Sequence, residues 1–222
     1  ASAQTTATTD PVGAMTVTIA GTQGNAFEAF SFFGVPVERS VEVADSVSSF
    51  APNEISLSEG GLTVDSFSSG YMVEISSGSN QGITSTITGN TEDVLTTVDD
   101  LSPFLEIGDT VSVRPYQTIA SVFGENNEAG LKAATSFSTA DQILVPDGAG
   151  GFVSYYYKSG GVGGSGWRTT TNAVADAGNA VLFPSDALIV KRRESGSLEL
   201  NLVGNIRTRD LTVPVEQGYT WL

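Results

Sequence analysis

The side chains that most often carry out catalysis are missing from this sequence. Its 222 residues include no histidine and no cysteine. Histidine is the commonest general base and the commonest ligand of transition metals, and cysteine provides thiolate nucleophiles and zinc ligands. A Ser-His-Asp triad needs a histidine and therefore cannot form. The composition thus excludes most nucleophilic and transition-metal chemistry.

Carboxylate pairs are the catalytic arrangement that the composition still allows. The chain holds 25 Asp and Glu residues, and the hydrolysis of a glycoside needs only two of them at a suitable separation. Asp99 and Asp100 form the most conspicuous pair, but adjacent residues on a strand point to opposite faces, and Asp100 is well placed to cap a helical turn. A carboxylate-based glycosidase is therefore our third choice, and we predict that the protein is not an enzyme.

A glycine-rich segment, GVGGSG at residues 161–166, matches the G-x-G-x-x-G pattern of dinucleotide-binding loops. In such loops a helix follows the glycines, and its N-terminus holds the pyrophosphate. Here the next residues, 167–171, read WRTTT and favour a strand. We therefore expect a hairpin loop and no nucleotide.

Two acidic loops and one aromatic cluster are the remaining candidates for binding. Residues 125–128 (ENNE) and the Asp147-Gly148 turn offer the oxygen ligands that calcium prefers, although no EF-hand spacing is present. We expect no cofactor, with calcium left as a possibility. Tyr156 and Trp167 are candidates for a platform that stacks on a sugar. Alternation along the strand turns Tyr156 away from its two tyrosine neighbours, so one face of that strand is expected to be core.

The elements that must position these residues are strands. Apolar and polar residues alternate in segments such as 15–19, 110–113 and 198–202, and glycine-rich turns separate the segments. We expect an all-β protein of two antiparallel units, of sandwich or barrel type. A small barrel, 42–116, is inserted into a sandwich-like unit formed by 1–41 plus 117–222.

We expect five or six strands in the barrel, and the candidates are 42–50, 54–57, 62–67, 71–76, 83–88, 94–98 and 109–115. Those of the other unit are 14–20, 27–33, 142–146, 152–158, 180–183, 187–193, 198–204 and 211–215. Short helical turns are expected within 100–105 and 117–123, where the apolar spacing loosens to three or four.

Charge and hydropathy limit the partners. The net charge is −15 and the pI is about 4.1, so nucleic acid and anionic membrane surfaces are poor partners. Residues 1–113 hold fifteen acids and one base, Arg39, whereas residues 114–222 hold ten acids and nine bases. No apolar run approaches the roughly 20 residues of a membrane helix, so no membrane span is expected.

An extracellular location follows from the low charge content and the start of the sequence. Charged residues are only 16% of the chain. The first residues, ASAQ, follow the small-residue pattern of a signal-peptidase site. We therefore expect a protein that is outside the cell or on its surface after removal of a signal peptide.

Seven segments carry a resemblance to a known family. They are 9–13 (TDPVG), 89–91 (GNT), 108–116 (GDTVSVRPY), 141–147 (DQILVPD), 155–157 (YYY), 166–168 (GWR) and 187–193 (ALIVKRR). On these segments the chain resembles an uncharacterised family of exported β-rich proteins from verrucomicrobial bacteria. The resemblance extends over nearly the whole chain and implies export and a shared β fold, but it implies no activity and no site residues.

Self-assembly is the function that we expect first. The segment Gln4, Thr5, Thr6, Ala7, Thr8 and Thr9 is uncharged and β-prone, so within residues 1–13 it is the candidate donor strand for a neighbouring subunit. The candidate basic interface, in the half of the chain that is nearly neutral, is Lys191, Arg193, Arg207 and Arg209. Head-to-tail contacts that do not close produce a filament.

We thus predict a non-enzymatic structural subunit of an extracellular filament or surface assembly, in which the partners are other copies of the same chain. The alternative is a carbohydrate- or calcium-dependent adhesin that binds an extracellular polysaccharide.

Overall fold

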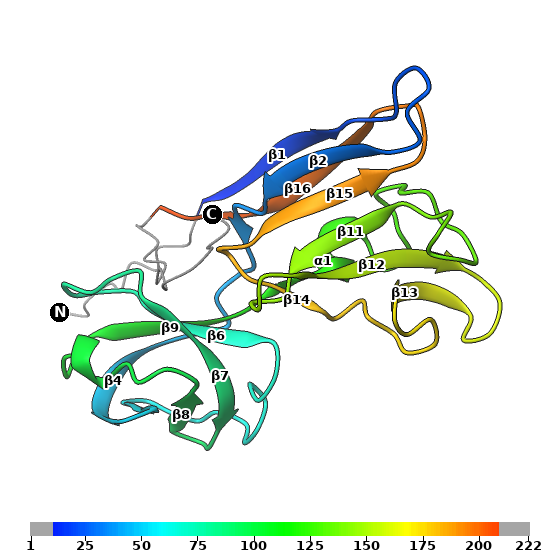
Figure 1. Cartoon of the computed structure of the whole chain (residues 1–222). Coiled ribbons are helices and arrows are strands. Elements are labelled where there is room, and N and C mark those ends of the chain that lie inside the picture. The colour runs from blue at the N-terminus through cyan, green and yellow to red at the C-terminus, as the bar shows by residue number, and fades with distance from the viewer. Residues whose placement is uncertain (1–10, 209–222) are drawn as a thin grey trace.

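Antiparallel strands form nearly all of the regular structure, as the alternation predicts. The computed structural model describes residues 11–208, which fold into a closed barrel and a second unit of packed sheets (Figure 1). The barrel strands are consecutive in the sequence, and the strands of the second unit come from both sides of them. The insertion of one β unit into the other is therefore confirmed.

Six strands close the barrel in the order β4-β5-β8-β7-β6-β9. Their bounds are β4 (Val43–Ala51), β5 (Glu54–Leu57), β6 (Tyr71–Ile75), β7 (Thr84–Asn90), β8 (Val94–Thr97) and β9 (Thr110–Pro115). Alternate side chains turn inward and fill the interior. The most deeply buried of them are Val47, Ile55, Val73, Ile75, Ile87, Leu95, Val111 and Val113.

The strand expected at residues 62–67 is wrong, because this segment forms a turn. Asp65 has a positive φ of 59°, which no strand residue adopts. The Asn90 side chain replaces the ladder here, accepting a hydrogen bond from the Phe67 amide at 2.9 Å and donating to the Thr63 carbonyl at 2.8 Å. The turn thereby places the buried Phe67 ring in the barrel core.

Two sheets build the second unit, which we call the sandwich. The larger has the order β13-β12-β11-β15-β2 and the smaller has the order β1-β16-β3. The larger consists of β13 (Ser165–Thr169), β12 (Phe152–Ser159), β11 (Gln142–Pro146), β15 (Ala187–Arg192) and β2 (Ala29–Gly34). The smaller consists of β1 (Val12–Ile19), β16 (Leu198–Ile206) and β3 (Val37–Glu38).

A common apolar core joins these sheets to a short helix. Buried side chains from both sheets and from α1 (Ile119–Phe123) belong to one cluster. The helix begins with a capping box between Thr118 and Ser121. The strand directly before it in the chain, β10 (Gln117–Thr118), pairs with β14 (Val181–Leu182) in a two-stranded ribbon. Among the described residues, no helix is long and apolar enough to cross a membrane.

Both helical turns expected from the sequence are present. The second is α1, and the first is the 3₁₀ turn η1 (Ser102–Phe104). Asp100 accepts a hydrogen bond from the Ser102 amide at 2.9 Å, although the N-cap position itself is Leu101. Hydrogen bonds from Ser102 hold the pKa of Asp100 below its usual value.

Candidate functional site

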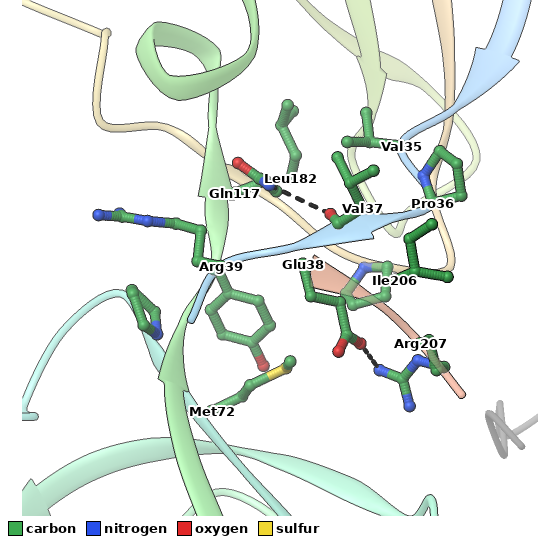
Figure 2. Close-up of a pocket in the computed structure, with 13 residues that line it drawn as sticks. Val35, Pro36, Val37, Glu38, Arg39, Met72, Gln117, Leu182, Ile206 and Arg207 are labelled. Atoms are coloured by element: carbon green, nitrogen blue, oxygen red, sulfur yellow. Dashed lines mark hydrogen bonds and ion pairs between the residues drawn. The ribbon is translucent and has the colours of Figure 1, made fainter. Parts of the chain in front are cut away.

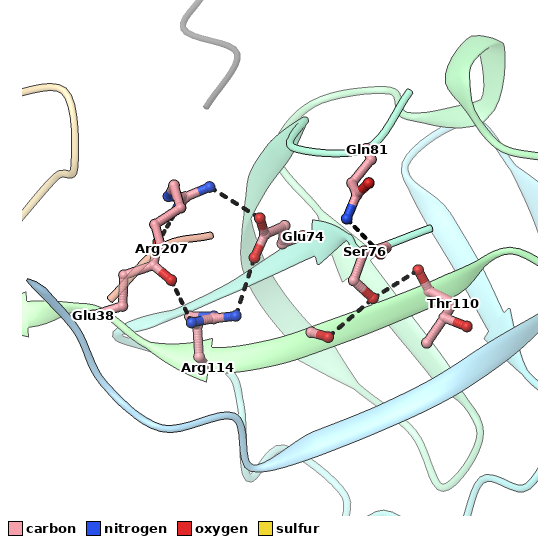
Figure 3. A network of polar contacts seen from close by, with 8 residues as sticks. Glu38, Glu74, Ser76, Gln81, Thr110, Arg114 and Arg207 are labelled. Atoms are coloured by element: carbon pink, nitrogen blue, oxygen red, sulfur yellow. Dashed lines mark hydrogen bonds and ion pairs between the residues drawn. The ribbon is translucent and has the colours of Figure 1, made fainter. Parts of the chain in front are cut away.

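A ring of four charged side chains joins the barrel to the sandwich. Arg114 on β9 donates to Glu74 on β6 at 3.1 Å and to Glu38 on β3. Arg207, which follows β16, donates to Glu74 at 2.9 Å and also to Glu38. Each carboxylate therefore receives two guanidinium groups, one from each unit (Figure 3). We call this arrangement the junction ring.

The junction ring is buried and its charges balance. Glu74 and Arg114 are both 0% exposed, and the Glu38 and Arg207 side chains are 8% and 12% exposed. Arginine does not release its proton in proteins, so these two residues cannot exchange protons with a substrate. Loss of any one member of such a buried cluster leaves an uncompensated charge and destabilises the arrangement. The ring is therefore a structural tie between the units.

An apolar groove runs beside the junction ring. Its larger part has a volume of about 360 Å³ and includes Val37, Met72, Tyr116, Leu182 and Ile206 in its wall (Figure 2). Burial raises the pKa of Tyr116, whose hydroxyl lies 2.8 Å from that of Thr86.

The smaller part of this groove has a volume of about 310 Å³ and includes Met15 and Phe33. Val35, Pro36 and Pro184 line both parts. We call the two parts together the junction groove.

A second hollow, lined in part by α1, is polar. Its volume is about 500 Å³. Residues from α1, β12, β13 and two loops converge on it, and those with polar or aromatic groups include Ser121, Glu125, Asn126, Tyr157, Asp176 and Asn179. Tyr157 packs edge to face on Trp167, with the ring centroids 5.2 Å apart. We call this feature the polar hollow.

Strand β2 is an edge of the larger sheet and exposes aromatic side chains. Its only ladder partner among the described residues is β15, with Phe30 opposite Lys191 and Phe32 opposite Ile189. Phe30 is 50% exposed and Phe32 is 67% exposed. An edge strand leaves a row of backbone donors and acceptors unpaired, and proteins usually protect such edges with charges or bulges. Here the outward-facing side chains are apolar.

The structure corrects the predicted sugar platform of Tyr156 and Trp167. Each is only 1% exposed. Tyr156 is covered on its face of the sheet by Phe137, with ring centroids 6.4 Å apart. The Trp167 indole donates to the Gly124 carbonyl at 2.8 Å inside the core. Tyr156 and Tyr157 lie on opposite faces as the alternation predicts, but a covering loop buries Tyr156, and Tyr157 is the tyrosine that lines a hollow.

The glycine motif forms the hairpin loop between β12 and β13, as predicted. Residues 160–164 connect the two strands. Lys158 donates to the carbonyl oxygens of Val162 and of Ala173, the second at 2.8 Å. Arg168 donates to a carbonyl of the same loop at 2.7 Å. The buried cations thus hold the loop from inside, and sequence spacing alone had not indicated this role.

The candidate basic interface is divided between two places. Lys191 and Arg193 both contact Glu28, at 3.4 and 2.8 Å, so they share a face as expected. Arg207 belongs to the junction ring instead. Arg209 lies outside the described residues, as does the candidate donor strand at 4–9. The three described cations therefore have acidic partners within their own chain.

The acidic loops are closed by their own hydrogen bonds. Asp147 accepts hydrogen bonds from the amides of Ala149 and Gly151, both at 2.8 Å, and these bonds lower its pKa. Backbone hydrogen bonds from Glu128 itself and from Asn126 likewise lower the pKa of Glu128. Within residues 11–208, no group of three or more acidic side chains is placed to hold a metal ion.

Comparisons with known proteins provide no relative. No family model matches the chain, and no curated protein or solved structure matches it either.

Proposed function

We propose that the protein is a non-enzymatic structural subunit of an extracellular filament or surface assembly, and that copies associate by adding a strand to β2. The observation that carries this proposal is the exposed aromatic edge formed by Phe30 and Phe32. Strand addition at such an edge supplies directional backbone hydrogen bonds, and the side chains beside it supply specificity.

The N-terminal segment 4–9 is the proposed donor. It is uncharged and contains four threonines, and β-branched side chains opposite aromatic ones form favourable cross-strand pairs. It ends at Thr9, and β1 begins at Val12, so a short linker separates the two. A donor strand beside β2 would extend the larger sheet and cover Phe30 and Phe32.

Other features support a structural role. The junction ring ties the two units into a fixed geometry, which suits a subunit whose shape must be reproduced along an assembly. The low fraction of charged residues, 16%, suits an extracellular β protein. The resemblance to exported verrucomicrobial proteins favours the same location.

Electron microscopy and light scattering test the proposal on the intact protein at matched concentrations. We expect filaments or regular oligomers from the intact chain, and monomers from a chain that lacks residues 1–10, because the donor is gone. Phe32→Asp is expected to abolish assembly as well. Phe27→Asp is the matched control, since Phe27 is 89% exposed but precedes the strand. Monomers of the intact chain under all conditions would overturn the proposal.

Carbohydrate binding is the second candidate, and the polar hollow favours it. Tyr157 offers an aromatic surface beside amide and carboxylate groups, including Asn126 and Asp176, which is a combination that suits sugar rings and hydroxyls. A Tyr157→Ala variant should lose glycan binding in an array experiment, whereas Tyr155→Ala should retain it. The absence of glycan binding by the intact monomer would remove this candidate.

A further inference from the structure

We propose that the junction groove is the docking site for the C-terminal segment, residues 209–222, of the same chain. This inference does not depend on assembly, because it concerns a contact within one copy.

The first argument is where the described chain ends. Ile206 is 46% exposed and forms part of the groove wall, and Arg207 beside it is held by the junction ring. The chain therefore leaves the described structure at the groove itself. Four extended residues span at most about 14 Å, so Leu211 can reach the groove without any movement of β16.

The second argument is the chemistry of the segment. After the charged residues Arg209 and Asp210, the sequence alternates apolar and other residues as LTVPV at 211–215, and Tyr219, Trp221 and Leu222 follow. Exposed apolar side chains gain about 25 cal/mol for each Å² that they bury. The junction groove is the apolar hollow closest to them along the chain.

The groove wall also selects against other occupants. Three of its lining residues are prolines: Pro36, Pro115 and Pro184. Proline has no backbone N–H, so this wall is poorly suited to a strand ladder and better suited to side-chain packing. The N-terminal segment also approaches here, because the Pro11 carbonyl accepts from the Ile206 amide at 2.8 Å. Its residues 1–10 have no apolar side chain larger than alanine, so they match the groove less well.

The short linker favours the same copy over a neighbour. A segment tethered next to its site has an effective concentration in the millimolar range. A second copy at micromolar concentration would compete poorly against it. The occupant is therefore the chain's own C-terminal segment.

The two methionines make this testable, because each lines one part of the groove. Met72 belongs to the larger part and Met15 to the smaller. The experiment records NMR spectra of the full chain labelled with ¹³C at the methionine methyl groups. We expect the Met72 signal to shift in Leu211→Glu and in a chain that ends at residue 208. Thr212→Glu, on the opposite face of the alternating segment, is expected to leave the signal in place.

A variant of the groove provides the reciprocal test. Ile206→Glu places a charge in the wall and should move the Met72 signal to its position in the chain that ends at 208. Val203→Glu is the matched control, because Val203 is 64% exposed on the same strand but outside the groove. An unchanged Met72 signal in Leu211→Glu and in the truncated chain would overturn the proposal.

Two further outcomes assign the groove to another occupant and would also overturn the proposal. If the Met72 signal of the full chain changes on dilution, and the mass before dilution is that of a dimer, the groove binds a second copy. A shift caused only by removal of residues 1–10 assigns it to the N-terminal segment. Failure of filament formation affects none of these readouts, so this proposal and the proposed function fail independently.

Discussion

The barrel and the sandwich are both antiparallel and both packed around apolar cores, but they differ in what their strands expose. No strand residue of the barrel is among the exposed large apolar side chains of residues 11–208. Six strand residues of the sandwich are among them: Val12, Met15, Phe30, Phe32, Val203 and Ile206. A closed barrel has no edge to protect, whereas an open sheet does. The sandwich is therefore the unit whose strands expose large apolar side chains.

The two units also use their charges differently. Within the described residues, each salt bridge of the barrel belongs to the junction ring. The sandwich holds additional buried cations, Lys158, Arg168 and Arg192, which fasten its loops and strand ends. The connections of the barrel are held by acidic and amide side chains such as Asp45 and Asn90, whereas those of the sandwich are held by buried cations. Four experiments can break or sharpen this comparison.

The largest effect is expected at the junction ring. Glu74→Gln removes the negative charge of one of the two carboxylates of the ring, to which both Arg114 and Arg207 donate. Because these groups are buried, the free energy of unfolding should fall by about 3–5 kcal/mol, measured by urea titration. Asp176→Asn is the control. Its side chain is 63% exposed and pairs with Arg168, so the loss should be at most about 1 kcal/mol. Equal stability of Glu74→Gln and the wild type would contradict the role of the ring.

Cavities in the two cores test whether the units unfold together. Leu95→Ala in the barrel and Leu188→Ala in the sandwich each remove a side chain that is 0% exposed, at a cost of about 2–5 kcal/mol. Since the ring joins the units, the fluorescence transition of Trp167 in the sandwich, recorded in a Trp221→Phe background, should move to lower urea in both variants. An unmoved transition in Leu95→Ala would show that the barrel unfolds separately.

A smaller loss of stability is expected when the sandwich loses a side chain that holds one of its loops. Lys158→Met removes the donor that satisfies the Val162 and Ala173 carbonyls. Loss of hydrogen bonds from a charged donor costs about 1.5–3 kcal/mol. Hydrogen exchange should accelerate in residues 160–174 and remain unchanged in the barrel. Acceleration in both units, or in neither, would argue against a local role for this lysine.

The smallest effect concerns Asp186 in the loop between β14 and β15. Burial raises its pKa, although a hydrogen bond from the Phe183 amide opposes the shift. A raised pKa means that ionisation is less favourable in the folded state, so this group destabilises the protein above its folded pKa. Asp186→Asn should therefore be more stable than the wild type at neutral pH. The difference should vanish below about pH 3.9, where the unfolded carboxyl is also protonated. A difference that does not change with pH would exclude ionisation as its cause.

The sequence by itself determined the class of fold and most of its elements. Alternation and glycine turns were sufficient to predict the all-β architecture, the insertion of the barrel and the positions of most strands, because a period of two is a local property. It failed at 62–67, where a side chain 23 residues away from Phe67, that of Asn90, supplies the hydrogen bonds that define the turn. Such a partner leaves no local signal.

Tertiary structure alone decided which faces are covered and which charges meet. Alternation placed Tyr156 and Tyr157 on opposite faces, but only the loop that carries Phe137 determines that Tyr156 is buried. The junction ring joins residues separated by as many as 169 positions, and each member looks like an ordinary surface charge in the sequence. Pairing at that distance depends on how the two units pack. The charges become buried only when the barrel and the sandwich come together, and only buried charges require a partner.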